Sequence, residues 1–214
     1  MSEPALQLET GAGPQAAGPV TSRIPSKLLG SLFRSHFGAL DTSRRLTVLE
    51  IGTALPETVN FFSGFTCRLH FVDLFAEPFV QAQQNRSESE LRAAFEACFR
   101  FPAGTRLDLC LFWDFLTYLD DTALRAFNAA LRPWLHRGTR AHGFGAHHMA
   151  VRLANVHYGI CDLDTFSLRD RRGPPLHMYP HSQIEMHDML SCFAFERGLL
   201  LPDGKLEMLL KPTL

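Results

Sequence analysis

The sequence predicts an α/β fold in which a doubly wound, mostly parallel sheet ends in a C-terminal antiparallel hairpin. Short apolar segments alternate with amphipathic ones along most of the chain, and such alternation of strands with helices favours parallel connections. The last apolar segments, residues 199–201 and 206–210, flank the sequence Pro202-Asp203-Gly204. This turn sequence is typical of a hairpin.

The composition is that of a folded protein with reduced thiols. Hydrophobic residues make up 46% of the 214 residues, which is enough for a core and excludes a wholly disordered chain. The five cysteines lack C-x-x-C spacing, so we expect free thiols and a cytoplasmic location. We find no signal-peptide pattern and no apolar run long enough to span a membrane. The net charge of −1 gives no signal for nucleic-acid or membrane binding.

The N-terminal region divides into a tail and a helix. Residues 1–21 are rich in Gly, Pro, Ala and Ser, and we predict a flexible tail followed by one folded domain over residues 22–214. Apolar residues recur at helical spacing from Ile24 to Phe37, and Gly38 is expected to end this helix. The helix is expected to pack on the sheet edge or to cover a pocket.

The remaining elements follow from local patterns. The predicted strands before the hairpin are residues 46–51, 68–74, 107–112 and 139–144. Helices are predicted to start near Pro56, at Ser87, at Asp121 or Thr122, and at Ser182. Glu90 and Glu185 stand three residues after the two serines, which is the spacing of a capping box.

Three boundaries of this scheme are less regular. The helix after Ser182 is expected to continue through Phe193. Between Asp73 and Leu107 the pattern indicates a helix but no third strand. Residues 157–180 are expected to form a loop between the last parallel strand and the last helix.

The strand over residues 46–51 carries the main functional signal. Its apolar run ends in Glu50 and Gly52, and the next strand closes on Asp73 about 20 residues later. Gly52 allows a sharp turn and a close approach of the backbone to a ligand. An acid in the position of Asp73 is placed to accept hydrogen bonds from a ribose diol. The pattern therefore predicts a nucleoside-type pocket.

This order of elements resembles the class I methyltransferases that use S-adenosylmethionine, over roughly residues 25–211. The first turn of that family reads acid-x-Gly-x-Gly-x-Gly, and here residues 50–56 read Glu-Ile-Gly-Thr-Ala-Leu-Pro. Glu50 and Gly52 match, whereas Ala54 and Pro56 replace the second and third glycines. The resemblance implies a Rossmann-like methyltransferase fold and S-adenosylmethionine as the cofactor.

The resemblance also implies which residues face the cofactor. Glu50 and the backbone of Gly52, Thr53 and Ala54 would face its methionine end, and Asp73 would hold its ribose. Two other interpretations remain open for the acids. Asp73 is also suited to cap the segment that follows it. Glu50 is also suited to a salt bridge with Arg44, Arg45 or Arg68.

Trp113 and Asp114 follow the strand over residues 107–112 and so lie at the carboxyl edge, where ligands bind in such sheets. Trp113 is suited to stack on adenine or substrate, and Asp114 to orient the acceptor nucleophile. Alternatively, the tryptophan covers the sheet edge and the aspartate caps a short helix. Asp108 begins its strand at the opposite edge and is interpreted as structural.

The last candidates follow the strand over residues 139–144. His147 or His148 is placed to act as a general base near the acceptor, although a surface or capping histidine is the favoured interpretation. The histidines lack the H-E-x-x-H spacing of a metal site, so none is predicted. Arg169, Arg171 and Arg172 are suited to grip an anionic acceptor, or to lie in a solvated loop.

Two functions of different classes remain. The first is an S-adenosylmethionine-dependent methyltransferase with an unidentified acceptor, in which catalysis consists mainly of aligning the reactants. The second is a methyltransferase-like fold that has lost cofactor binding and serves as a protein-interaction module. An active pocket keeps its polar groups, whereas an abandoned pocket fills with bulky side chains.

Overall fold

The computed structural model describes residues 26–146 and 150–214. Its main sheet has six strands in the order β3-β2-β4-β5-β9-β8. These strands are β2 (Leu46–Ile51), β3 (Cys67–Val72), β4 (Leu109–Trp113), β5 (Arg140–Gly145), β8 (Phe193–Leu200) and β9 (Leu206–Pro212). The first four pair in parallel, and β9 runs antiparallel to both β5 and β8. The predicted α/β fold with a C-terminal antiparallel hairpin is confirmed.

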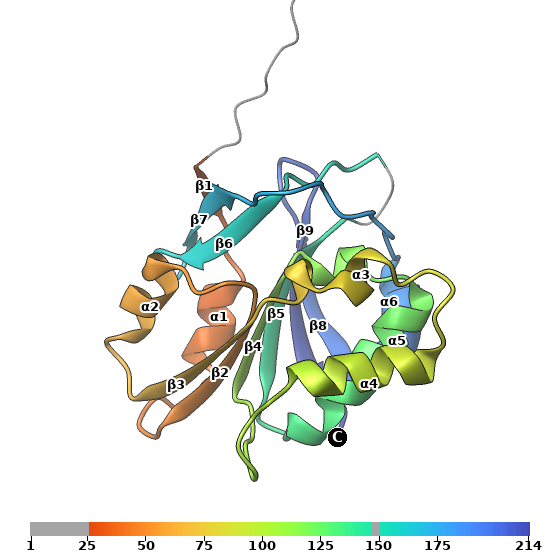
Figure 1. The fold of residues 1–214 in the computed structure, drawn as a ribbon. Helices are drawn as coiled ribbons and strands as arrows, with labels where there is room; N and C mark the ends of the chain where they lie inside the picture. The colour runs from red at the N-terminus through yellow and green to blue at the C-terminus, as the bar shows by residue number, and fades with distance from the viewer. Residues whose placement is uncertain (1–25, 147–149) are drawn as a thin grey trace, which may run out of the picture.

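Helices cover both faces of this sheet (Figure 1). One face carries α3 (Pro78–Gln81), α4 (Glu88–Cys98), α5 (Asp121–Leu131) and α6 (Gln183–Met189), and the other carries α1 (Phe33–Gly38) and α2 (Pro56–Phe62). Along β2, Leu49 and Ile51 enter the first core and Leu46 and Val48 the second. The continuous apolar run of β2 therefore reflects burial on both faces. No helix in the described part of the chain is long and apolar enough to cross a membrane.

A second, three-stranded antiparallel sheet lies across the carboxyl ends of β2 and β4, at the top of Figure 1. It consists of β1 (Lys27–Leu29), β6 (Val156–Ile160) and β7 (Thr165–Asp170), in the order β1-β7-β6. Tyr158 and Phe166 of this sheet share a buried core with Val48 and Trp113 of the main sheet. The small sheet thus covers the edge where a ligand was expected.

Several local predictions are confirmed. Ser87 with Glu90 and Ser182 with Glu185 both form capping boxes. Among the described residues, no strand lies between β3 and β4. Asp108 directly precedes β4, at the amino edge, where its Oδ2 accepts a hydrogen bond from the Thr47 N–H.

Other predictions are wrong. Residues 27–29, expected to be helical, form a strand because they pair with β7. The expected loop over residues 157–180 contains β7 and all of β6 except its first residue, Val156. The last helix ends at Met189 rather than continuing to Phe193, which begins β8. The cap of α5 is Asp120, whose side chain accepts from the Ala123 N–H at 2.8 Å. The predicted tail over residues 1–21 and the histidines His147 and His148 lie outside the described residues.

Candidate functional site

Three carboxylates come from the carboxyl ends of the adjacent strands β2, β3 and β4. Glu50 is the penultimate residue of β2, Asp73 follows β3, and Asp114 follows β4. Parallel strands end at a common edge of the sheet, so the fold assembles these acids at one end of the molecule. Each of them has a buried oxygen with no hydrogen-bond partner among the described residues.

Glu50 is 2% exposed and faces the core beneath the small sheet. Its Oε1 accepts a hydrogen bond from the indole N–H of Trp113 at 3.1 Å, and its Oε2 is buried without a partner. Burial raises the pKa of Glu50 to about 8, although the bond from Trp113 opposes this shift. Glu50 is therefore protonated at neutral pH, and it makes no ion pair with Arg44, Arg45 or Arg68.

Asp73 is half-buried beside an open pocket of about 410 Å³. It stands at the start of a 3-10 helix over Leu74–Ala76, but its side chain makes no capping hydrogen bond. Its Oδ1 is buried and unpaired, and the pocket is lined on other sides by Phe75, His157 and Arg172. A carboxylate oxygen in this position is free to accept a hydrogen bond from a bound ligand.

Trp113 is 2% exposed, and its backbone is strained. The residue has φ +50°, a left-handed conformation that is rare for large side chains, and the pairing of β4 with β5 shifts register beside it. The indole stacks on the Tyr158 ring with centroids 5.4 Å apart and an interplanar angle of 9°. The Tyr158 ring thus covers one face of the indole and occupies the stacking position predicted for adenine or substrate.

Asp114 is completely buried. Its Oδ2 accepts hydrogen bonds from the hydroxyls of Tyr118 at 3.1 Å and Tyr158 at 3.3 Å, and its Oδ1 lies 3.8 Å from Arg171 Nη2. Burial raises the pKa of Asp114 to about 6, whereas the Arg171 charge and the Tyr118 bond oppose the shift. Its side chain does not cap the short helix that follows.

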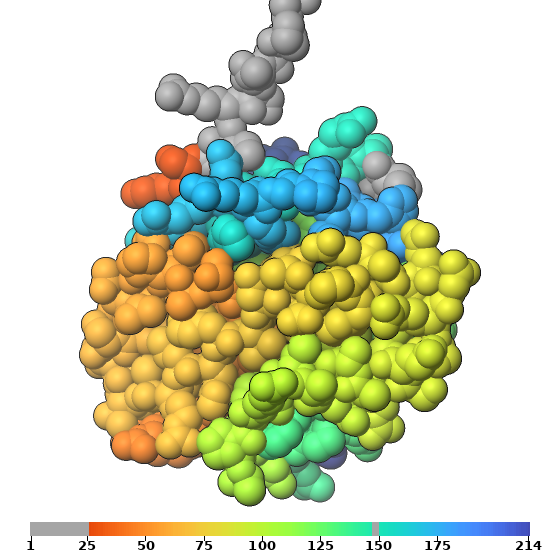
Figure 2. Space-filling model, viewed as in Figure 1, coloured from red at the N-terminus to blue at the C-terminus, as the bar shows by residue number. Residues whose placement is uncertain are grey.

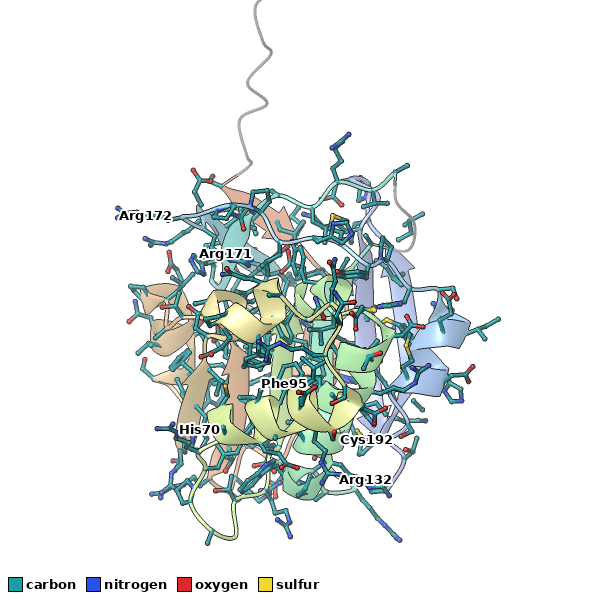
Figure 3. The ribbon with its side chains drawn as sticks, turned by 45° about the vertical axis from the view of Figure 1, so that its right-hand side comes forward. His70, Phe95, Arg132, Arg171, Arg172 and Cys192 are labelled. Carbon is teal, nitrogen blue, oxygen red and sulfur yellow. The ribbon has the colours of Figure 1, made fainter. Side chains whose placement is uncertain are left out.

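Arg171 follows β7 and reaches down toward these acids. Its guanidinium carbon lies 3.6 Å from the centroid of the Phe75 ring, a cation–π contact, and its Nη2 donates to the Val156 carbonyl at 2.5 Å. Nε and Nη1 are buried without hydrogen-bond partners among the described residues. Figure 3 shows Arg171 and Arg172 near the upper end of the sheet, with His70 and Arg132 toward the other end.

The space beside Gly52 is filled by protein atoms. The hollow lined by Glu50, Gly52 and Thr53 has a volume of about 0 Å³, because Trp113, Tyr158, Phe75 and Arg171 close it. Figure 2 shows the segment that includes β7, in blue, lying across the top of the molecule against the orange and yellow residues that follow β2 and β3. The pocket beside Asp73 stays open, so only one part of the expected site has room for a ligand.

A cofactor of the S-adenosylmethionine type therefore fits in part. The unpaired Asp73 oxygen and its open pocket suit a ribose. The methionine end has no room beside Gly52 while Arg171 and the rings of Phe75, Trp113 and Tyr158 keep these positions. Of the other predicted residues, Thr53 lines the closed hollow, Ala54 is exposed, and His147 lies outside the described residues.

The sequence interpretation did not include Tyr158 and Phe75, and it assigned the arginines differently. Arg169 pairs with Glu57 through Nη2 at 2.5 Å, and Arg171 pairs with Asp114, so neither is free to hold an anionic acceptor. The alternation of apolar and polar residues over 156–160 and 165–169 is a strand signal that would have placed Tyr158 and Arg171 near the edge.

No family model matches the sequence, and no curated protein matches it. Among solved structures, an S-adenosylmethionine-dependent methyltransferase from Clostridium acetobutylicum is similar with a TM-score of 0.46 and 12% identity, over 78% of this chain and 83% of that one. The mitomycin 7-O-methyltransferase MmcR is similar with a TM-score of 0.47 and 14% identity. The similarity covers 86% of this chain and 55% of the MmcR chain. The 1,6-didemethyltoxoflavin-N1-methyltransferase from Burkholderia thailandensis, solved with bound 1,6-didemethyltoxoflavin and S-adenosylhomocysteine, has a TM-score of 0.47 and 14% identity, over 85% of this chain and 75% of that one.

Proposed function

We propose that this protein is an S-adenosylmethionine-dependent methyltransferase whose cofactor site is closed by Arg171 in the structure described. The observation that carries the proposal is a cluster of three acids, Glu50, Asp73 and Asp114, each with a buried oxygen that accepts no hydrogen bond in the described part of the chain. The Asp114 oxygen has only the charge of Arg171, at 3.8 Å, for a partner. A buried polar atom without a partner costs about 1–3 kcal/mol, so three at one sheet edge point to a ligand that satisfies them.

The type of ligand follows from the chemistry of these groups. Asp73, beside the open pocket, would accept hydrogen bonds from the ribose hydroxyls. Asp114 would face the positively charged part of the cofactor, whereas Glu50, which is neutral at pH 7, would offer it only a hydrogen-bond acceptor. When bound, S-adenosylmethionine supplies an activated methyl group on its sulfonium.

The Arg171 side chain would have to move away from Phe75 and Asp114 for the cofactor to bind in this way. Its guanidinium lies between the Phe75 ring and Asp114. The positively charged part of the cofactor would lie beside the same carboxylate, and the two cations would repel each other. A cationic ligand would replace Arg171 in its contacts with the aromatic face and the acid. The proposal also includes a cytoplasmic location, which fits the five free cysteines.

A second candidate function is a non-catalytic interaction module with the same fold. The specific observation in its favour is the stack of Trp113 on Tyr158, which fills the edge with bulky side chains. In this case Glu50, Asp73 and Asp114 are left from a cofactor site that no longer functions, and no adenosyl ligand binds.

Isothermal titration with S-adenosylhomocysteine separates the two functions. The methyltransferase proposal expects saturable binding that Asp73→Asn weakens by about tenfold or more, because asparagine has no negative charge and offers one acceptor oxygen instead of two. Asp188→Asn is the matched control, since Asp188 is an exposed carboxylate on α6 outside the pocket. Absence of saturable heat with both the wild-type and the Arg171→Ala proteins would overturn the proposal and favour the module.

A further inference from the structure

A hollow lined by arginines lies at the opposite edge of the main sheet from the candidate site. Arg44 and Arg45 precede β2, Arg68 is the second residue of β3, and Arg106 precedes β4. Parallel strands begin at a common edge, which lies at the bottom of Figure 1, and the four arginines line one hollow there. We name this space of about 560 Å³ the arginine hollow.

The carboxylate that lines the hollow is Asp108, and it is already engaged. Its Oδ2 accepts from the Thr47 N–H at 2.7 Å, and its Oδ1 contacts Arg44 Nη2 at 2.5 Å and His136 Nε2 at 3.1 Å. The Asp108 side chain is 3% exposed, so it holds these donors at the base of the hollow. The charge of Asp108 thus compensates that of Arg44, and Asp108 makes no ion pair with Arg45, Arg68 or Arg106.

The remaining three arginines have no carboxylate within 4.0 Å in the described part of the chain. Arg106 is held in place because its Nη1 donates to the carbonyls of Thr105 at 3.0 Å and Pro133 at 3.2 Å. Arg45 and Arg68 are exposed on the same hollow. The chain carries a net charge of only −1, so this concentration of positive charge is local. The arginines around the hollow repel one another, and a bound anion would reduce this repulsion.

We propose that the arginine hollow binds a phosphate-bearing small molecule. Guanidinium groups match phosphate oxygens in paired hydrogen bonds, and several such groups around one cavity create a site for that anion. The volume lies in the range of small-molecule sites. A small ligand is favoured over nucleic acid, because this cluster of four arginines surrounds a single hollow on a protein with a net charge of −1.

Titration of the full chain with pyrophosphate at constant ionic strength tests this site. We expect saturable 1:1 binding and a rise in Tm, with sodium chloride of equal ionic strength as the reference. Arg45→Gln and Arg68→Gln should each weaken the affinity about tenfold or more. Arg125→Gln, which removes an exposed arginine on α5 outside the hollow, should leave it unchanged.

Three results would overturn the proposal. The first is the absence of saturable binding above the chloride reference. The second is equal weakening by Arg125→Gln, which would indicate attraction to charge in general. The third is tighter binding of a single-stranded oligonucleotide than of pyrophosphate, with loss of that binding in Arg45→Gln and Arg68→Gln. Because Arg45 and Arg68 are exposed, both variants should keep the wild-type Tm, so that a change in binding reports on the hollow itself.

Discussion

The guanidinium of Arg171 lies over the Phe75 ring, 3.6 Å from its centroid, while its Nη2 lies 3.8 Å from Asp114 Oδ1. The contact joins the end of β7 to the segment that follows β3, and it closes the hollow beside Gly52. A cation held between an aromatic face and a buried carboxylate is attracted to both. Arg171 is therefore the side chain whose removal most directly opens the candidate site.

Arg171→Ala should bind S-adenosylhomocysteine about tenfold more tightly than the wild type. In the wild-type protein only the fraction of molecules with Arg171 displaced is competent to bind, and the substitution removes this restriction. Asp114 loses its positive neighbour, so the variant should also have a lower Tm, part of which the ligand restores. Titration calorimetry measures the affinity and thermal unfolding the stability. Equal or weaker binding by a folded Arg171→Ala protein would contradict the closed-site interpretation.

The raised pKa of Glu50 predicts that the folded protein loses stability as the pH rises. Its pKa is about 8 in the folded protein and ordinarily near 4.5, so between these values the folded state keeps a proton that the unfolded chain has released. The free energy of unfolding then falls with rising pH, by up to about 1.4 kcal/mol per pH unit. Asp114 adds a change of the same sign, but only up to about pH 6.

Glu50→Gln isolates this effect, because glutamine keeps the acceptor for the Trp113 indole without ionising. Between pH 6 and 8 the variant should lose less stability than the wild type, and at pH 8 it should be the more stable protein. Urea unfolding across this range provides the measurement. Parallel pH profiles for the two proteins would show that Glu50 ionises normally.

Glu207 should be essential for stability. Its side chain is fully buried, pairs with His142 Nε2 at 2.9 Å, and accepts from the backbone N–H groups of Ser31, Leu32 and Phe33. Burial raises the pKa of Glu207, but the bond and charge of His142 and these N–H groups outweigh burial and lower it. Glu207→Gln should lower the free energy of unfolding by about 3–5 kcal/mol, since it breaks a buried pair.

The half-exposed Glu196, which lies 3.5 Å from His36, offers the control, and Glu196→Gln should change stability by less than about 0.5 kcal/mol. Hydrogen exchange gives the local readout. The amides of residues 31–33 should exchange faster in Glu207→Gln alone. Similar losses in both variants would mean that the bonds to the N-terminal segment are not the source of the effect.

Gly143 should not tolerate a side chain. A Cβ at this position would lie 2.8 Å from the Trp113 carbonyl oxygen, whereas a Cβ at Gly64 would meet nothing within 4 Å. Gly143→Ala should therefore destabilise the protein by about 1–3 kcal/mol, and Gly64→Ala should leave stability unchanged or slightly higher. Chemical denaturation of the two variants makes the comparison. Equal stabilities would show that the strained backbone at Trp113 can shift.

Local signals predicted the elements that depend on local residues. The apolar run of β2, the capping boxes at Ser87 and Ser182 and the turn at Pro202 each contain their own physical cause, and each is found in the structure. The edge position of Asp73 followed from the same logic, because a strand end is defined by its own sequence.

The features that sequence reasoning missed depend on contacts between distant residues. Lys27–Leu29 has a helical pattern, yet it forms a strand because residues 165–167 of β7 offer backbone partners. Arg171 was interpreted as free to hold an anion, but Phe75 and Asp114, far away in the sequence, bind it instead. Only the tertiary structure reveals that the chain supplies its own cation at this edge.

The hydrogen bonds that the N–H groups of residues 31–33 donate to Glu207 also determine when this part of the fold can form during protein synthesis. The amide of Leu32 is 175 residues away from its acceptor, so a growing chain must expose this amide long before β9 leaves the ribosome. Contacts of such sequence separation form slowly, and strand β1 waits for β7 in the same way. In nascent chains the amides of residues 31–33 should therefore stay without this acceptor until Glu207 has left the ribosome.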